Sequence, residues 1–153
     1  MTVSDFKDLH CLIVDDDGVF LKVLEALLKS LGVGKVTCAR NGSEALTTLS
    51  ASQRTVDVIL ADLKMVAGNG LQDLKAVRTG QNKYLRPDTC FIMLSALAEP
   101  YAIKAAAMLD AQGYLVKPLT LEKLRIAIVE ARKSNFAVDL ALYAPVRVPS
   151  SEL

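Results

Sequence analysis

The fold is decided near the start of the chain, by the stretch LHCLIVDDDG at residues 9–18. Its mostly apolar part, Leu9–Val14, is typical of a buried strand, and three acids, Asp15–Asp17, end that strand abruptly. Apolar side chains then recur at helical spacing as far as Leu31, and Gly32 follows where the end of a helix is expected. The stretch therefore predicts a strand, an acidic turn and a helix, which is the repeating unit of an α/β fold.

The same unit recurs four more times along the chain. Further short strands are predicted at Lys35–Arg40, Val56–Ala61, Cys90–Leu94 and Gly113–Val116. Helices are predicted around Ala45–Leu49, Leu71–Val77, Tyr101–Leu109 and Leu121–Ala131, the last two opened by Pro100 and by a Thr120 cap. Five strands that alternate with five helices predict a parallel sheet covered on both faces, because parallel strands need long crossover connections.

Length and composition agree with one well-packed globular domain. The chain has 153 residues, of which 52% are hydrophobic and 23% charged, and its mean hydropathy is +0.31. A net charge of +1 argues against broad attraction to nucleic acid or an anionic membrane. No apolar run reaches the roughly 18–20 residues of a membrane helix, and Asp5, Lys7 and Asp8 argue against a signal peptide. We therefore expect a soluble, cytoplasmic protein.

Residues 1–133 contain all of the strand and helix alternation, and we expect them to form one domain. Residues 134–153 are expected to be a C-terminal tail rather than a second domain, with disorder in parts of it. The segment after Ser134 has no clear periodicity, contains two prolines and ends in Ser-Ser-Glu-Leu.

Sulfur and imidazole chemistry is not expected to carry the function. The three cysteines, Cys11, Cys38 and Cys90, are widely spaced in apolar stretches, and His10 is the one histidine in the sequence. This pattern indicates small buried side chains and a strand residue near the domain edge rather than a zinc site or a disulfide framework.

Polar side chains with chemical uses follow four of the five predicted strands. The first strand ends at Asp15 and Asp16, the third at Asp62, the fourth at Ser95 and the fifth at Lys117. Functional groups in an open parallel sheet collect at the carboxyl ends of the strands. We therefore expect three acids, a hydroxyl and an ammonium to meet in one pocket.

This combination points to magnesium and to phosphoryl transfer. Two like charges 4 Å apart repel by about 4 kcal/mol at an effective dielectric of about 20, and one lysine does not neutralise three acids. The site is therefore expected to bind a hard divalent cation such as Mg²⁺, which prefers carboxylate oxygens and water. A carboxylate beside a metal and an ammonium is suited to attack on phosphorus.

The strand motifs resemble the receiver domain of bacterial two-component response regulators. The resemblance covers about residues 7–133 and rests on four segments: LIVDDD (12–17), VILADLKM (58–65), IMLSA (92–96) and GYLVKP (113–118). It implies a flavodoxin-like, doubly wound (βα)5 fold with five parallel strands in the order 2-1-3-4-5.

The resemblance also implies a role for each of the site residues. Asp62 is expected to accept a phosphoryl group from a histidine kinase or a phosphotransfer protein. Mg²⁺ is expected to bind the carboxylates of Asp15, Asp16 and Asp62 and the backbone carbonyl of Lys64. The phosphoryl group is expected to contact Lys117, whose bond to Pro118 is expected to be cis, and the hydroxyl of Ser95. Tyr114 is then expected to move inward behind Ser95.

Signalling is expected to pass by protein contact rather than by an output domain. Too few residues follow position 133 for a helix-turn-helix domain, and their charge does not suit a nucleic-acid arm. The resemblance implies a switch with self-catalysed phosphotransfer and autodephosphorylation, not a metabolic enzyme. The expected surface for a downstream protein or a second copy is formed by the fourth helix, fifth strand and fifth helix. The alanine-rich helix Tyr101–Leu109 suits such docking, although the same composition is consistent with close packing on its own sheet.

The sequence departs from the family pattern in the loop after the acceptor. Val66 stands where relatives usually have proline, although Asn69-Gly70 retains a turn signal. Lys64 and Leu97 occupy the two positions that, by the resemblance, flank the path of the hydrolytic water. Our hypothesis is a comparatively long-lived phosphorylated form; a solvated lysine with no such role is the alternative for Lys64.

Two other classes of protein remain as alternatives. A magnesium-dependent phosphohydrolase with an aspartyl nucleophile also uses clustered acids, and Asp15 and Asp17 have the two-residue spacing of its nucleophile and general acid. A flavodoxin-like nucleotide or flavin carrier is disfavoured, because Asp15–Asp17 would repel a phosphate in the first loop. The kinase, the stimulus and the downstream target are not encoded in any of these motifs.

Overall fold

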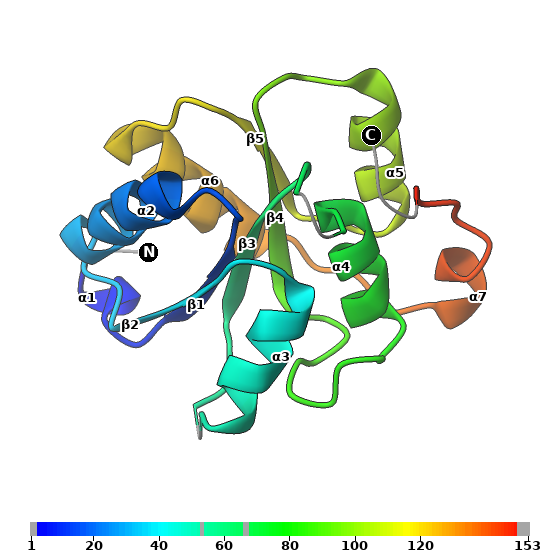
Figure 1. Ribbon diagram of the computed structural model, residues 1–153, viewed down its shortest axis with the longest axis horizontal. Helices are drawn as coiled ribbons and strands as arrows, with labels where there is room; N and C mark the ends of the chain where they lie inside the picture. Colours follow the sequence, from blue (N-terminus) through cyan, green and yellow to red (C-terminus); the bar gives the residue numbers. More distant parts are fainter. Residues whose placement is uncertain (1–2, 53, 66–67, 150–153) are drawn as a thin grey trace.

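The computed structural model describes residues 3–52, 54–65 and 68–149, and these ranges contain the predicted alternation (Figure 1). The strands are β1 (His10–Val14), β2 (Lys35–Ala39), β3 (Val58–Asp62), β4 (Cys90–Ser95) and β5 (Gly113–Val116). The longer helices are α2 (Gly18–Ser30), α3 (Gly42–Ser50), α4 (Gly70–Arg78), α5 (Pro100–Met108) and α6 (Leu121–Lys133). Two single-turn helices, α1 (Val3–Phe6) and α7 (Leu140–Tyr143), were not predicted, because one turn is too short to show a helical period.

The five strands form one parallel sheet in the order β2-β1-β3-β4-β5. The doubly wound α/β fold and the strand order implied by the family resemblance are both confirmed. Strand β1 pairs with β3 so that Val14 lies opposite Ala61, and Asp62 in turn lies opposite Leu94 of β4. The residues that follow these strands are therefore brought to the same edge of the sheet.

Helices cover both faces of the sheet because the side chains of each strand alternate between them. In β1, Leu12 and Val14 pack in the core shared with α3, α4 and α5, whereas Cys11 and Ile13 pack in the core shared with α1, α2 and α6. Figure 1 shows the two helical layers on opposite sides of the strands. The sheet is thus buried on both sides, as its continuous apolar strands predict.

Side-chain caps fix where the helices begin beside the sheet edge. Asp17 accepts hydrogen bonds from the backbone of Val19 and Phe20, and Thr120 accepts one from Lys123, as predicted for Thr120. Asn69 caps α4 in a reciprocal capping box with Gln72. Asp17 and Thr120 lie a few residues after β1 and β5, and Asn69 ends the loop after β3, so each caps the helix that follows a strand of the site.

The histidine and the cysteines are structural, as predicted for His10, Cys11 and Cys90. His10 is fully buried in β1 and its Nε2 lies 2.7 Å from Thr37 Oγ1. Burial raises the pKa of the Cys11 thiol to about 12 and that of Cys90 to about 11, so both are poor nucleophiles. Cys38 is half-buried. Among the described helices, none combines the length and the hydrophobicity needed to cross a lipid bilayer.

The segment after α6 folds back against the domain. We call residues 136–149 the C-terminal strap; it contains α7, which lies beside α4 in Figure 1. Tyr143 and Val146 are buried and join the core beneath α4 and α5. The sequence indicated only a tail here, and residues 150–153 lie outside the described ranges.

Candidate functional site

Three carboxylates meet at the carboxyl ends of β1 and β3. Asp15 and Asp16 directly follow β1, and Asp62 is the last residue of β3. Each offers an oxygen atom, and these oxygens lie within 4.8 Å of one another. The pairing of β1 with β3 causes this convergence, because it sets the two strand ends side by side. The acidic cluster predicted from the sequence is therefore present.

Lys117 reaches this cluster from the end of β5. Its Nζ atom lies 2.8 Å from Asp15 Oδ2 and 3.3 Å from Asp62 Oδ1, so one ammonium bridges both acids. The same Nζ lies 3.9 Å from the centre of the Phe20 ring, which covers it from α2. The peptide bond from Lys117 to Pro118 is cis, as expected.

Burial and neighbouring charges shift the pKa values of two residues in the site, Asp62 and Lys117. Burial, with a further contribution from the negative charge on Asp15, raises the pKa of Asp62 to about 6, although Lys117 opposes the rise. Burial alone would lower the pKa of Lys117, but its hydrogen bond to Asp15 and the charge on Asp62 raise it overall. Asp15 is 1% exposed, and its Oδ1 also accepts a hydrogen bond from the backbone of Asp17. Lys117 pairs with both Asp15 and Asp62, and the remaining negative charge of this acid cluster favours a further cation.

The donor set fits a hard divalent cation. The three side chains offer only carboxylate oxygens, which Mg²⁺ and Ca²⁺ prefer to nitrogen or sulfur ligands. Asp15 and Asp62 are buried and Asp16 is half-buried, which leaves one side of the cluster open to water. This arrangement suits Mg²⁺, which usually keeps several water ligands.

Ser95 lies next to the site, but its hydroxyl is engaged elsewhere. It is one residue beyond Leu94, the β4 partner of Asp62, and is 3% exposed. Its Oγ donates to the Leu97 carbonyl oxygen at 2.6 Å and accepts from the Leu97 backbone N–H at 3.2 Å. The hydroxyl must break this local turn before it can contact a group on Asp62.

Tyr114 already points into the protein. Its ring packs against the core beneath α5, and its hydroxyl is buried without a hydrogen-bond partner among the residues described. The expected inward position is therefore the one seen here, with the Ser95 hydroxyl still bonded to Leu97. A buried hydroxyl without a hydrogen-bond partner destabilises the folded state, so a movement that gives the Tyr114 hydroxyl a partner would be favourable.

The acceptor loop is tied to the start of α5 by an ion pair. Lys64 Nζ lies 2.8 Å from Glu99 Oε1, with about half of the lysine side chain exposed. Glu99 is the residue before α5, so the pair connects the loop after Asp62 with that helix. Leu97 is 63% exposed, and Val66 lies outside the described residues.

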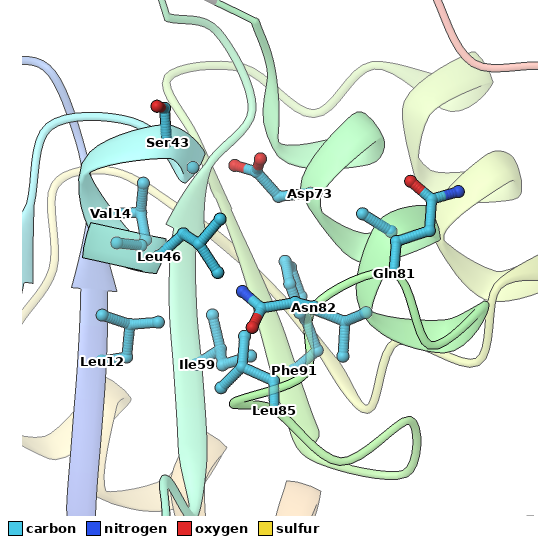
Figure 2. Close-up of a pocket in the computed structure, with 14 residues that line it drawn as sticks. Leu12, Val14, Ser43, Leu46, Ile59, Asp73, Gln81, Asn82, Leu85 and Phe91 are labelled. Atoms are coloured by element: carbon cyan, nitrogen blue, oxygen red, sulfur yellow. The ribbon is translucent and has the colours of Figure 1, made fainter. Parts of the chain in front are cut away.

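A separate cavity lies between α3 and α4, away from the acid cluster. Its volume is about 330 Å³, and its walls are mainly apolar side chains such as Leu12, Ile59 and Phe91 (Figure 2). Asp73 of α4 lines it, and one of its carboxylate oxygens is buried with no hydrogen-bond partner in the part of the chain that the structure describes. Burial raises the pKa of Asp73 to about 6. The sequence pattern does not single out Asp73, because an acid in the first turn of a helix usually indicates only a favourable dipole interaction.

Comparison with known proteins finds similar proteins over most of the chain. Residues 11–129 match the family model described as response regulator receiver domain. The probable chemotaxis protein CheY of Rhizobium etli is 32% identical over 126 residues, which cover 82% of this chain and 94% of that protein. The transcriptional regulatory protein ZraR of Klebsiella oxytoca is 31% identical over 82% of this chain, but the match spans only 26% of that longer protein.

Solved structures are similar over the same part of the chain. The chemotaxis protein CheY4 of Vibrio cholerae superposes with a TM-score of 0.70 at 29% identity, covering 80% of this chain and 98% of that one. A response regulator of Burkholderia pseudomallei, solved with a phosphorylated aspartic acid, a calcium ion and citrate, gives a TM-score of 0.67 at 27% identity. That match covers 82% of this chain and 69% of the Burkholderia chain.

Proposed function

Because the chain belongs to the family of response regulator receiver domains, we propose that Asp62 accepts a phosphoryl group from a histidine kinase or phosphotransfer protein. The single observation that carries this proposal is the convergence of three carboxylates on the Lys117 ammonium. The receiver is residues 1–133, with 134–153 as an appended segment. It acts in the cytoplasm as a signalling switch rather than as a metabolic enzyme.

Phosphoryl transfer needs a nucleophilic oxygen on Asp62 and positive charge around the phosphoryl group. An Asp62 oxygen attacks phosphorus, the P–N bond to the donor histidine breaks, and the leaving imidazole keeps the electron pair and takes a proton from solvent. Lys117, 3.3 Å from Asp62, neutralises charge on the phosphoryl oxygens. Asp15, Asp16, Asp62 and the Lys64 carbonyl would hold a Mg²⁺ ion, which would neutralise further charge on the phosphoryl oxygens. The Burkholderia relative, with its phosphorylated aspartic acid and calcium ion, supports this assignment.

The signal leaves the site through Ser95. The phosphoryl group brings a charge of about −1.5 to −2 and new acceptor oxygens, which draw the Ser95 hydroxyl away from the Leu97 carbonyl. The loop that follows Ser95 runs directly into α5, so the change is delivered to the surface made by α5, β5 and α6. That surface exposes apolar side chains including Tyr101, Ile103 and Met108, which suits a downstream protein or a second copy of this chain.

A phosphohydrolase that uses Asp15 as nucleophile is less well supported. Its general acid would be Asp17, whose carboxylate accepts two backbone N–H groups at the start of α2. Both hydrogen bonds commit an oxygen of this carboxylate to the first turn of α2. Asp17 therefore serves as the cap of α2.

The test uses acetyl phosphate and Mg²⁺ with intact-mass measurement. We expect one phosphate per chain in the wild type, none in Asp62→Asn, and normal incorporation in Asp17→Asn, which keeps a capping side chain. Steady release of phosphate from esters that survives Asp62→Asn but not Asp17→Asn would overturn the switch in favour of the hydrolase.

A further inference from the structure

Among the described residues, hydrogen bonds hold the C-terminal strap at three points: at Lys75 in α4, at the Asn69 cap of α4, and at Asp110 just beyond α5. The Lys75 Nζ donates to two strap carbonyl oxygens, those of Ala144 at 3.0 Å and Val146 at 2.7 Å. The Tyr143 hydroxyl donates to Asp110 Oδ2 at 2.6 Å, just beyond α5. The Asn69 side chain donates to the Pro149 carbonyl oxygen at 3.0 Å. Such specific contacts distinguish the strap from a segment that merely lies on the surface.

One end of the strap reaches the loop that follows the phosphoacceptor. Asn69 pairs with Lys64 in a short antiparallel bridge, and the next backbone N–H, that of Gly70, donates to the Leu63 carbonyl oxygen. Asn69 also caps α4. The strap residue Pro149 is therefore hydrogen-bonded to Asn69, and the Asn69-Gly70 backbone in turn pairs with the residues that directly follow Asp62.

The middle of the strap joins α4 to α5. Tyr143 is fully buried and Val146 is 4% exposed, and both pack in the core that α4 and α5 share. Burial, together with the hydrogen bond to Asp110, raises the pKa of Tyr143 to about 12, so this hydroxyl remains a donor at neutral pH. Any displacement of α5 against α4 must strain these contacts.

Phosphorylation has a direct route to such a displacement. Ser95 reaches a phosphoryl group only by leaving the Leu97 carbonyl, and the loop it belongs to leads into α5 at Pro100. The buried face of α5 consists of the small residues Ala102, Ala105 and Ala106. Their short side chains interlock little with the neighbouring core, so they offer little resistance to sliding of the helix. The opposite end of α5 is the part that the strap holds.

We propose that the C-terminal strap is a restraint on the receiver switch, docked before phosphorylation and released from α4 and the end of α5 when Asp62 is phosphorylated. The proposal rests on the proposed function of Asp62. Because coupling between two sites is reciprocal, a strap that phosphorylation releases must itself oppose phosphorylation. Weakening its docking contacts is therefore expected to strengthen binding of a phosphoryl analogue.

The test measures the apparent affinity of the full-length chain for beryllofluoride in the presence of Mg²⁺. Two variants each weaken one anchor: Tyr143→Phe removes the hydrogen bond to Asp110, and Lys75→Met removes the two bonds to the strap carbonyls. Matched controls are Tyr84→Phe, in an exposed loop, and Lys22→Met, on the opposite helical layer. Tyr143→Phe is expected to bind the analogue about 2- to 10-fold more tightly than the wild type, the range expected for one net hydrogen bond. Lys75→Met, which loses two hydrogen bonds, is expected to show at least as large a gain. The controls are expected to match the wild type.

Hydrogen exchange gives the complementary readout in the unmodified protein. Amides of the strap, in particular those of Tyr143 and Ala144, are expected to exchange faster once beryllofluoride and Mg²⁺ are bound. Unchanged strap exchange together with unchanged affinities in both variants would overturn the coupling. A wild type that binds no beryllofluoride and takes no phosphate on Asp62 would instead overturn the proposed function and the restraint with it.

Discussion

The most quantitative prediction concerns Asp73, a largely buried acid at the cavity between α3 and α4. Its carboxylate points across the cavity toward α3 in Figure 2, and one of its oxygens is buried with no hydrogen-bond partner among the described residues. Gly42 of α3 leaves room for it, since a Cβ atom at that position would lie 2.5 Å from Asp73 Oδ1. The charged form is thus poorly solvated and unpaired, and removing the charge is expected to stabilise the fold.

The size of the effect follows from the pKa. Burial raises the pKa of Asp73 from 3.8 to about 6, and each pKa unit corresponds to about 1.4 kcal/mol. Ionised Asp73 therefore costs the folded state about 3 kcal/mol. The folded state binds its proton more tightly, so this group favours folding below pH 4 and loses that effect as the pH rises through about 6. We predict that Asp73→Asn unfolds at higher urea concentration than the wild type at pH 7.5, with a free energy of unfolding larger by about 3 kcal/mol.

The assay is urea unfolding of both proteins at several pH values. The advantage of Asp73→Asn is expected to shrink between pH 6.5 and 4.5 and to vanish near pH 4, where the wild-type carboxyl is protonated in both states. Asp8→Asn, at an exposed position, is the control and is expected to show no such trend. A variant that is no more stable than the wild type at pH 7.5, or an advantage independent of pH, would refute the reasoning.

Three further predictions address the core, the site and the loop. Arg78→Met is expected to lower the free energy of unfolding by roughly 3–5 kcal/mol in urea titrations. The reason is that the buried guanidinium donates to four backbone carbonyl oxygens and to Gln112. A loss below about 1 kcal/mol would contradict this expectation. Lys117→Met is expected to slow phosphorylation by acetyl phosphate roughly 100- to 1,000-fold, and an unchanged initial rate by intact mass would remove Lys117 from the mechanism. If the phosphorylated form is long-lived because of the acceptor-loop side chains, Lys64→Ala and Leu97→Ala lose phosphate faster than the wild type. Unchanged or slower loss in both variants would rule that hypothesis out.

The sequence was sufficient for the parts of the molecule that rest on local patterns. Asp15, Asp62 and Lys117 could be placed in one pocket because each directly follows an apolar strand, and parallel strands end at one edge. Asp17 and Thr120 each lie directly before a helical pattern of apolar residues, where Asp and Thr commonly cap a helix. Both caps are therefore predictable from the local sequence.

The remaining features depend on contacts between distant segments. Arg78 stands in the last turn of a helix, where a basic residue normally indicates only a dipole interaction, yet it is fully buried and bonds to the end of α5. Tyr143 lies in a one-turn helix without periodicity, and its burial depends on a groove built by α4 and α5. The engagement of Ser95 with Leu97 is a rotamer choice, which sequence spacing does not encode.

The central claim, that the strand-end acids and Lys117 form one phosphoryl site, is tested most directly by a crystal structure of the full chain with beryllofluoride and Mg²⁺. The account predicts beryllium bonded to an Asp62 carboxylate oxygen, the cation among Asp15, Asp16 and Asp62, and Lys117 Nζ on a fluorine atom. An unmodified Asp62, or beryllofluoride bound anywhere else, would contradict it.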